Sequence, residues 1–139
     1  MTRPSWQQTW MNIAHEISKR SYDPKMKVGC VIVAEDNSVM LSCGYNGNAK
    51  GLPNIPESTE PGMSGFLHAE LNACIKSDYN FPKKKHMYCT HSPCRNCAKI
   101  IINSQISVFY YDKLYRDTSG IDLLTTCGIQ VINVNELNI

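Results

Sequence analysis

The sequence predicts an α/β fold in which a mixed sheet of five strands is covered by helices on both faces. Short β-branched segments alternate with helical segments in the second half of the chain, which favours parallel strands joined by crossover helices. Two strand-like segments near the start are separated only by the turn Asp36-Asn37, which indicates an antiparallel hairpin. The length of 139 residues suits one domain, spanning residues 1–139.

The first half of the chain is predicted to hold one helix and the hairpin. Apolar residues recur at three- and four-residue spacing in residues 5–21, which indicates an amphipathic helix that ends before Asp23-Pro24. Residues 28–36 and 38–45 are the two strands of the hairpin. Residues 46–65 are rich in Gly, Pro and polar residues, and a loop of this length in a compact domain is usually functional or disordered.

The second half is predicted to contain three helices and three strands in alternation. Gly128 is expected to end the last of these helices as its C-cap. The segments in order are helix 66–77, strand 86–91, helix 94–104, strand 106–112, helix 118–127 and strand 128–134.

Composition narrows the class of protein. The formal net charge of +2 is not the signature of a polyanion-binding protein. No segment approaches the ~18 consecutive apolar residues of a membrane helix, and residues 1–10 lack the apolar core of a signal peptide. Seven cysteines are an odd number, which without a secretory signal indicates a reducing compartment. We therefore expect a cytoplasmic protein whose cysteines serve metal binding or catalysis rather than disulfides.

The pair Cys94 and Cys97 is the first candidate for chemistry. A spacing of three residues at the start of a helix places both sulfurs on one side, and the helix N-terminus lowers thiol pKa values, as zinc binding requires. The alternatives are a redox pair or two core cysteines. A thioredoxin-like pair is disfavoured because Pro93 precedes the motif and two strands come earlier. Since the chain has no second C-x-x-C, a third ligand must come from elsewhere.

His68 and Glu70 complete the pattern. Taken alone, His68 would be a surface or capping histidine, and Glu70 a carboxylate that favours the helix dipole. Together with the cysteines they match H-x-E…P-C-x-x-C, the general signature of zinc deaminases of cytosine and adenine bases. In that chemistry zinc lowers the pKa of its water towards ~7. Glu70 would take a proton from this water, which attacks C4 of cytosine or C6 of adenine, and would then protonate the ring nitrogen and the leaving amine.

Five segments carry a further likeness to known proteins. They are RSYDPKMKVGCVIV (20–33), GYNG (44–47), HAELNA (68–73), MYCTHSPCRNCAK (87–99) and DKLYRD (112–117). With these segments the sequence resembles the deoxycytidylate (dCMP) deaminases of the cytidine-deaminase-like superfamily, over nearly the whole chain. The zinc motif marks only the superfamily, whereas the first three segments are closer to the dCMP branch.

The resemblance implies a three-layer α/β/α sandwich and a set of site residues. It implies zinc held by His68, Cys94 and Cys97, with Glu70 as the proton shuttle. The implied substrate contacts are Asn46 at the sugar, Ala69 and Ser92 at the pyrimidine, Arg20, Ser21 and Lys27 around the phosphate, and Tyr115. Asn46 can also be read as a turn residue before Gly47, and Arg20 as a helix-end charge. The sequence departs from the family at His91, where relatives carry an apolar residue.

The implied reaction is the zinc-dependent hydrolysis of dCMP to dUMP and ammonia, which supplies deoxyuridylate for thymidylate synthesis. The sequence does not decide between dCMP itself and dCMP that carries a substituent at C5 of the base. The resemblance also suggests a homo-oligomer, with a hexamer favoured, and dCTP or dTTP as effectors. The remaining cysteines and one methionine are expected to serve core or loop packing: Cys30, Cys43, Cys74, Cys89, Cys127 and Met63.

Two other functions stay open. The segment FYYDKLY (109–115) is similar to the aromatic loop of polynucleotide cytidine or adenosine deaminases, but such enzymes need a basic groove, and a net charge of +2 disfavours one. A non-catalytic zinc-binding module is the second alternative. Glu70 argues against it, because a structural zinc site has no need of a carboxylate beside the metal.

Overall fold

Five strands form one sheet, in the order β2-β1-β3-β4-β5, in the computed structural model, which describes residues 2–138. Strand β1 is antiparallel to both β2 and β3, whereas β3, β4 and β5 are mutually parallel. The sheet is therefore mixed, because β3 is antiparallel to β1 of the early hairpin and parallel to β4 of the later crossovers. The strands are β1 Gly29–Ala34, β2 Met40–Tyr45, β3 Lys85–His91, β4 Ile106–Lys113 and β5 Gln130–Asn133.

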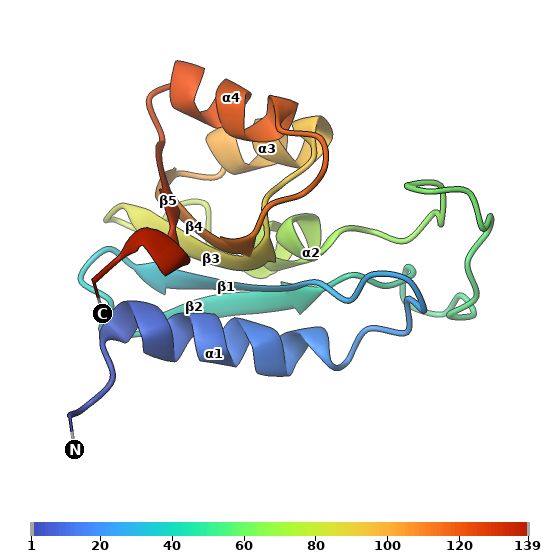
Figure 1. The fold of residues 1–139 in the computed structure, drawn as a ribbon, viewed down its shortest axis with the longest axis horizontal. Helices are drawn as coiled ribbons and strands as arrows, with labels where there is room; N and C mark the ends of the chain where they lie inside the picture. Colours follow the sequence, from blue (N-terminus) through green and yellow to red (C-terminus); the bar gives the residue numbers. More distant parts are fainter. Residues whose placement is uncertain (1, 139) are drawn as a thin grey trace.

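Helices cover both faces of the sheet, which confirms the predicted three-layer α/β/α class (Figure 1). Helix α1 lies on one face, and α2, α3 and α4 lie on the other. The segment between β2 and α2 projects from one end of the sheet as the predicted long loop (Figure 1). The remaining elements are α1 Trp6–Ser18, α2 Ala69–Lys76, α3 Arg95–Ile102, α4 Ser119–Thr126 and a terminal 3-10 turn, Val134–Glu136.

Element ends differ from the predicted ones by a few residues, and one difference matters for the site. Helix α2 begins at Ala69 rather than at residue 66, because His68 has extended dihedral angles (φ −73°, ψ 155°) and is the N-cap residue. Helix α3 begins at Arg95, with Cys94 as its N-cap residue. Within residues 2–138, no helix is long and apolar enough to cross a membrane.

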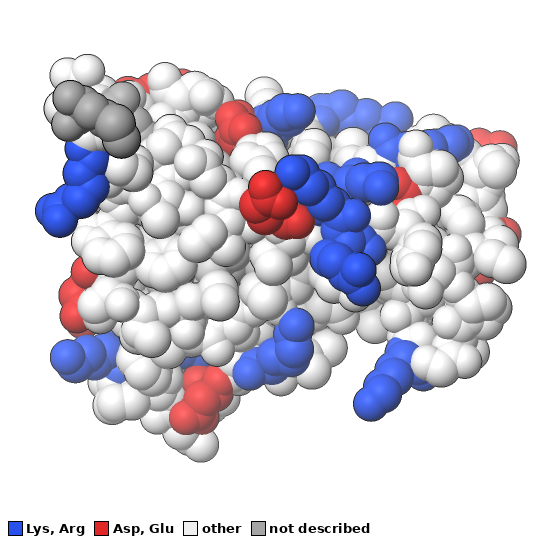
Figure 2. Space-filling model, turned by 90° about the horizontal axis from the view of Figure 1, so that it is seen from below, with Lys and Arg blue, Asp and Glu red and all other residues white. Residues whose placement is uncertain are grey.

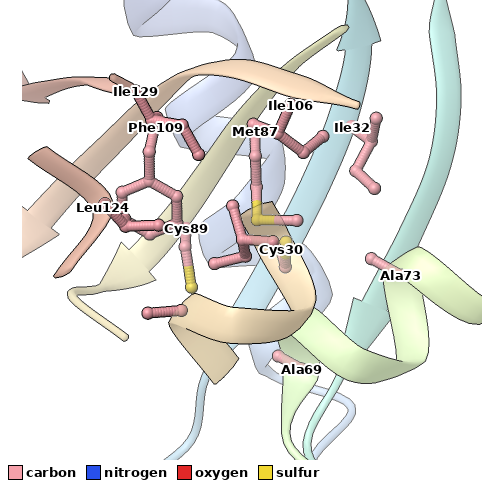
Figure 3. Packing of buried hydrophobic residues seen from close by; sticks show 12 residues of the cluster. Cys30, Ile32, Ala69, Ala73, Met87, Cys89, Ile106, Phe109, Leu124 and Ile129 are labelled. Carbon is pink, nitrogen blue, oxygen red and sulfur yellow. The ribbon is translucent and has the colours of Figure 1, made fainter. Parts of the chain in front are cut away.

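The hydrophobic core is divided by the sheet. On the face of α1, Trp10, Met11 and Ala14 pack against Val31 and Tyr88. On the other face, the side chains of β1, β3 and β4 meet α2, α3 and α4 (Figure 3). This second cluster contains Cys30, Ile32, Ala69, Ala73, Met87, Cys89, Ala98, Ile101, Ile106, Phe109, Leu124 and Ile129.

The structure supports most of the packing roles expected for the remaining cysteines. Cys30 and Cys89 are fully buried as cross-strand partners of β1 and β3. Cys43 and Cys74 are partly buried against the two core clusters. Cys127 is exposed at the end of α4, and Met63 is 63% exposed on the long loop, so the packing role predicted for these two residues is wrong.

A close approach of α2 to β2 fixes the position of the helix that carries His68 and Glu70. A Cβ atom added at Gly44 would lie 2.6 Å from both the Ala69 carbonyl oxygen and the Ala73 nitrogen. These neighbours are backbone atoms and cannot rotate away, so the helix can lie this close only because residue 44 is glycine.

We expect Gly44→Ala to destabilise the protein by about 1–3 kcal/mol, the usual cost of overpacking, because α2 must shift away from β2. Denaturant unfolding measures the change. Gly47→Ala is the matched control, since its added Cβ would lie in ordinary contact with the Tyr45 ring, at 3.7 Å. Equal unfolding midpoints for the two variants would contradict the argument.

His86 is expected to make the protein less stable in mild acid. Its Nδ1 atom is buried and has no hydrogen-bond partner among residues 2–138, and burial lowers the pKa of the ring below the ordinary value of 6.5. A histidine whose pKa is lower in the folded state binds protons more readily when unfolded, so stability falls as the pH drops through 6.5. His86→Phe should therefore lose less stability than the wild type between about pH 7.5 and 5.5. Parallel slopes in chemical denaturation across this range would refute the prediction.

Candidate active site

Three potential metal ligands meet where α2 and α3 begin. The His68 Nδ1 atom lies 3.1 Å from the Cys97 Sγ and 3.5 Å from the Cys94 Sγ. All three ligand atoms lie within 4.8 Å of one another. His68 and Cys94 are the N-cap residues of the two helices, and Cys97 is in the first turn of α3. The crossover through β3 thus brings together two motifs that are 26 residues apart in the sequence.

The spacing of these atoms fits a tetrahedral zinc ion. With Zn–S and Zn–N bonds of about 2.3 and 2.0 Å, tetrahedral geometry places a sulfur and a nitrogen ligand about 3.5 Å apart. The two measured N–S separations of 3.1 and 3.5 Å are close to this value. One imidazole and two thiols are also a donor set that zinc favours, and three protein ligands leave a position for water.

The two thiols share hydrogen bonds that favour a thiolate. The pKa of Cys94 is lowered to about 4, first by its hydrogen bond with Cys97 and then by His68. The Cys97 backbone N–H also donates to the Cys94 sulfur at 3.4 Å, as a helix cap. The pKa of Cys97 is raised, because its thiol proton is held by the Cys94 sulfur and because the group is buried. Negative charge is therefore favoured on Cys94.

Glu70 is buried beside this cluster. It is the second residue of α2 and only 4% exposed. Burial raises the pKa of its carboxyl group above the ordinary value of 4.5, and the neighbouring His68 opposes this only in part. A carboxyl group with a raised pKa is suited to both accept and release a proton near neutral pH.

A cavity of about 580 Å³ opens over this cluster. Its size is typical of pockets for small organic ligands. The walls include His68, Glu70 and Cys94, together with four of the residues predicted to contact substrate, which are Asn46, Ala69, Ser92 and Tyr115. His91 is also part of the wall.

The amide of Asn46 holds the turn that leads into β1. Its Oδ1 atom accepts from the Val28 backbone N–H at 2.8 Å, and its Nδ2 donates to the Met26 carbonyl at 2.8 Å and to Asp23 at 3.3 Å. The amide orientation is therefore fixed from both ends. One Oδ1 lone pair is left over to accept a hydrogen bond from a ligand.

Ser92 and Tyr115 join two walls of the cavity. The Tyr115 backbone N–H donates to the Ser92 hydroxyl at 2.6 Å, and the Ser92 N–H donates to the Lys113 carbonyl at 2.9 Å. The segment after β4 is thereby attached next to Cys94. Phe109 and Tyr110 are buried in the two core clusters and Tyr111 packs against one of them, so three of the four aromatic rings of FYYDKLY are used in packing rather than left free to stack on a base.

The three residues predicted to surround a phosphate lie elsewhere. Ser21 is buried, and its hydroxyl donates to the Asn46 carbonyl at 2.9 Å, which makes it a support for the loop. Arg20 and Lys27 are exposed, and within residues 2–138 neither they nor Ser21 are part of the cavity wall. The structure thus does not bring these three residues to the cavity in which Asn46, Ala69, Ser92 and Tyr115 lie.

Other residues of the wall were missed by the sequence reasoning. Asp23 and Lys25 come from the turn before β1, Asn96 from the first turn of α3, and Arg116 from the segment after β4. The available signal was their presence in the family-like segments 20–33, 87–99 and 112–117. Their spacing in the sequence could not place these residues at the cavity, because they reach it only when separate loops fold next to one another.

The fold and this cluster define a class of protein. A His-Cys-Cys metal site at two helix N-termini, with a buried glutamate beside it, is the arrangement of a zinc-dependent base deaminase. Residues 4–113 match the family model described as the cytidine and deoxycytidylate deaminase zinc-binding region. The chain belongs to this family, and zinc is its metal.

Individual relatives agree with this assignment. The chain is 32% identical to the deoxycytidylate deaminase of Saccharomyces cerevisiae over 94% of its own length but 45% of that protein's. It is 31% identical to the deoxycytidylate deaminase of Enterobacteria phage T2, with 94% of the chain and 93% of the relative covered. The cyanophage S-TIM5 dCMP deaminase, solved in complex with dCMP and dUMP, matches with a TM-score of 0.81 and 32% identity over 94% of this chain and 98% of that one.

The relatives differ in length. The chain covers 64% of the ComE operon protein 2 of Bacillus subtilis, 55% of the probable deoxycytidylate deaminase of Caenorhabditis elegans and 44% of the deoxycytidylate deaminase of Schizosaccharomyces pombe. It thus spans about half to two thirds of several of the curated relatives it matches.

Proposed function

We propose that this chain is a hydrolase that converts dCMP and water into dUMP and ammonia, and so supplies deoxyuridylate for thymidylate synthesis. The observation that carries the proposal is the His-Cys-Cys cluster beside a buried glutamate, on the wall of a cavity of about 580 Å³. The relatives named deoxycytidylate deaminase and the dCMP and dUMP complex of the cyanophage protein support this choice of substrate.

His68, Cys94 and Cys97 are the proposed zinc ligands, through Nδ1 and the two Sγ atoms. Bound zinc would supply a Lewis acid that lowers the pKa of a water molecule towards ~7. The helix N-termini at Cys94 and His68 favour the negative charge that the ligand set requires. Their N-cap positions also hold the donor atoms in place before a metal binds, since both helices are fixed to the sheet.

Glu70 is the proposed proton shuttle. Its buried carboxylate would accept a proton from the attacking water and pass it to N3 of the cytosine ring. It would then move the remaining proton of that water, now on the C4 hydroxyl, to the amine at C4 as the C4 carbonyl forms. The C4–N bond then breaks, and ammonia leaves. Burial raises the pKa of Glu70, which favours its protonated form and suits it to carry the proton between the two transfers.

The proposed pocket positions the base between the helix start and the end of β3. Ala69 is the first residue of α2, where a backbone N–H has no partner within the helix and can donate to a carbonyl oxygen of the base. Ser92 and Tyr115 form the facing wall, and Asn46 offers its remaining lone pair to a sugar hydroxyl. We further propose that residues 1–139 work as a single deaminase domain.

A substrate screen tests the proposal. Purified protein is assayed for ammonia release from dCMP, CMP, deoxycytidine, dCMP with a methyl or hydroxymethyl group at C5, and a single-stranded cytosine-containing oligonucleotide. We expect the deoxynucleoside monophosphates to be the preferred class. Faster turnover of the oligonucleotide or of deoxycytidine than of any mononucleotide would overturn the proposal. Stoichiometric zinc without turnover of any of these would favour a non-catalytic zinc-binding module.

The proposal includes a cellular setting. We propose a cytoplasmic homo-oligomer, with a hexamer favoured, on the basis of the family resemblance and of the free cysteines. Light scattering of the purified protein gives the number of subunits. Assays of dCMP turnover with and without dCTP or dTTP test the proposed effectors.

A further inference from the structure

His91 is a polar residue of the cavity wall that the proposed reaction does not use. It is the last residue of β3 and directly precedes Ser92, another residue of the wall. Lys113 of β4 is its partner in the parallel register of the sheet. The position of His91 is therefore set by the end of the sheet rather than by one of the loops around the cavity.

The hydrogen bonds around Thr90 determine which nitrogen of His91 carries the proton. Thr90 is fully buried, and its hydroxyl oxygen accepts from the Gly29 backbone N–H at 3.2 Å. The His91 Nδ1 atom lies 2.9 Å from the same oxygen. Within residues 2–138 this hydroxyl has no other partner, so it donates its proton to Nδ1. The neutral imidazole of His91 therefore carries its own proton on Nε2.

The surroundings keep His91 neutral and leave its Nε2–H group available. Burial lowers the pKa of His91 below the ordinary value of 6.5, Lys113 and His15 act in the same direction, and Asp112 opposes them. Protonation of Nδ1 would also leave the proton of the buried Thr90 hydroxyl without an acceptor, which is costly. Among residues 2–138, Nε2 has no hydrogen-bond partner, yet it is not a buried atom. Its N–H group is thus open to a ligand.

The proposed reaction fixes the orientation of the base relative to His91. Glu70 has to reach N3 and the Ala69 N–H has to reach O2, and both residues lie in the first turn of α2. The edge of the ring that contains C2 and N3 therefore faces α2. The edge that contains C5 and C6 is on the opposite side of the ring, and so faces the wall that includes His91, Ser92 and Tyr115.

From this arrangement we infer that His91 determines which substituents are accepted at C5 of the cytosine, by donating a hydrogen bond from Nε2–H to the substituent. This inference rests on the proposed function. A hydroxymethyl group fits, because its oxygen can accept the hydrogen bond. A methyl group at C5 would displace water from the Nε2–H group without replacing the hydrogen bond, which weakens binding. The substrate class thus includes 5-hydroxymethyl-dCMP in preference to 5-methyl-dCMP.

The substituted base is expected in a mononucleotide rather than in a polynucleotide. Figure 2 shows the face that carries α1, where basic side chains lie beside acidic ones and broad uncharged areas separate them. A single strand is held by a basic groove that follows its backbone, and this face does not offer one. The test therefore uses mononucleotides.

The test compares nucleotides that differ only at C5. The efficiency kcat/KM is measured for dCMP, 5-methyl-dCMP and 5-hydroxymethyl-dCMP with the wild type, His91→Leu and His91→Gln. The wild type should prefer the hydroxymethyl nucleotide to the methyl one. His91→Leu should lower this preference by about three- to tenfold, because one hydrogen bond to the substituent is lost. Glutamine keeps an N–H donor, so His91→Gln should retain most of the preference.

Binding of the two 5-substituted dUMP products, measured by calorimetry, should change in the same direction as the efficiencies. A ratio of efficiencies cancels any general disturbance, including the loss of the partner of Thr90. If His91→Leu does not fold, the double variant Thr90→Val with His91→Leu removes both members of that hydrogen bond and takes its place. His86→Leu is the matched control and should leave the preference unchanged, because His86 lies on the same strand but, within residues 2–138, outside the cavity wall.

The inference is overturned if the wild type prefers the methyl nucleotide or accepts neither substituted nucleotide. It is also overturned if His91→Leu keeps the wild-type preference, or if His86→Leu lowers the preference equally. In these cases turnover of dCMP would leave the proposed function in place. A wild type that deaminates none of the three nucleotides would overturn the proposed function itself, and the inference with it.

Discussion

Replacement of Glu70 by glutamine is expected to abolish deamination while leaving the fold and the zinc content unchanged. Glutamine has nearly the same shape as glutamate, but it cannot accept and release the protons that the reaction moves. General acid–base groups contribute roughly 10²- to 10⁴-fold to rates, so kcat should fall by at least this factor. Because the buried carboxylate costs stability when charged, the substitution should not lower the melting temperature.

Three measurements separate this outcome from simple damage to the protein. Zinc content, circular dichroism and binding of dUMP should all match the wild type. Glu16→Gln is the matched control, because Glu16 is exposed on α1 and, in the part of the chain that the structure describes, forms an ion pair only with Lys19 at 3.0 Å. Turnover by Glu70→Gln within a few-fold of the Glu16→Gln value would remove Glu70 from the mechanism.

The proximity of His68, Cys94 and Cys97, the proposed zinc ligands, could be predicted from the sequence because their positions depend on local structure. Cys94 and Cys97 share one helix start, and a helix start fixes both sulfurs relative to each other. His68 marks the start of another helix, and a crossover through β3 brings the two starts together. The order of strands and helices could be predicted for the same reason, because the spacing of apolar residues within each segment indicates whether that segment is a strand or a helix.

The remainder of the cavity could not be predicted in this way. Its wall combines the turn before β1, the long loop and the segment after β4, and their approach is set by contacts such as those of Lys25 with Thr59 and Tyr115 with Ser92. These contacts join residues distant in sequence and carry no periodic signal. The choice of Arg20, Ser21 and Lys27 came from a family-like segment, within which the structure brings Asp23 and Lys25 to the wall instead.

Loss of the metal is expected to be the most damaging change to the folded state. In Cys97→Ala one of the three proposed ligands is removed, and the remaining imidazole and thiol cannot complete a tetrahedral site. Since binding of a metal to the native state alone stabilises it, the variant should lose most of its zinc, melt at a lower temperature and lose nearly all turnover. The melting temperature of the wild type should fall in the same direction when a chelator removes its zinc.

Cys97 is also buried in the first turn of α3. A lower melting temperature could therefore come from loss of the metal or from loss of a packed side chain, and the two causes must be separated. Adding zinc and chelator makes this separation. Zinc should raise the melting temperature of the wild type but not that of Cys97→Ala, because only the wild type binds the ion tightly. Cys127→Ala removes an exposed thiol and should respond to zinc as the wild type does. If Cys97→Ala keeps stoichiometric zinc after dialysis against a weak chelator, Cys97 is not a ligand, and the metal must be held by other groups.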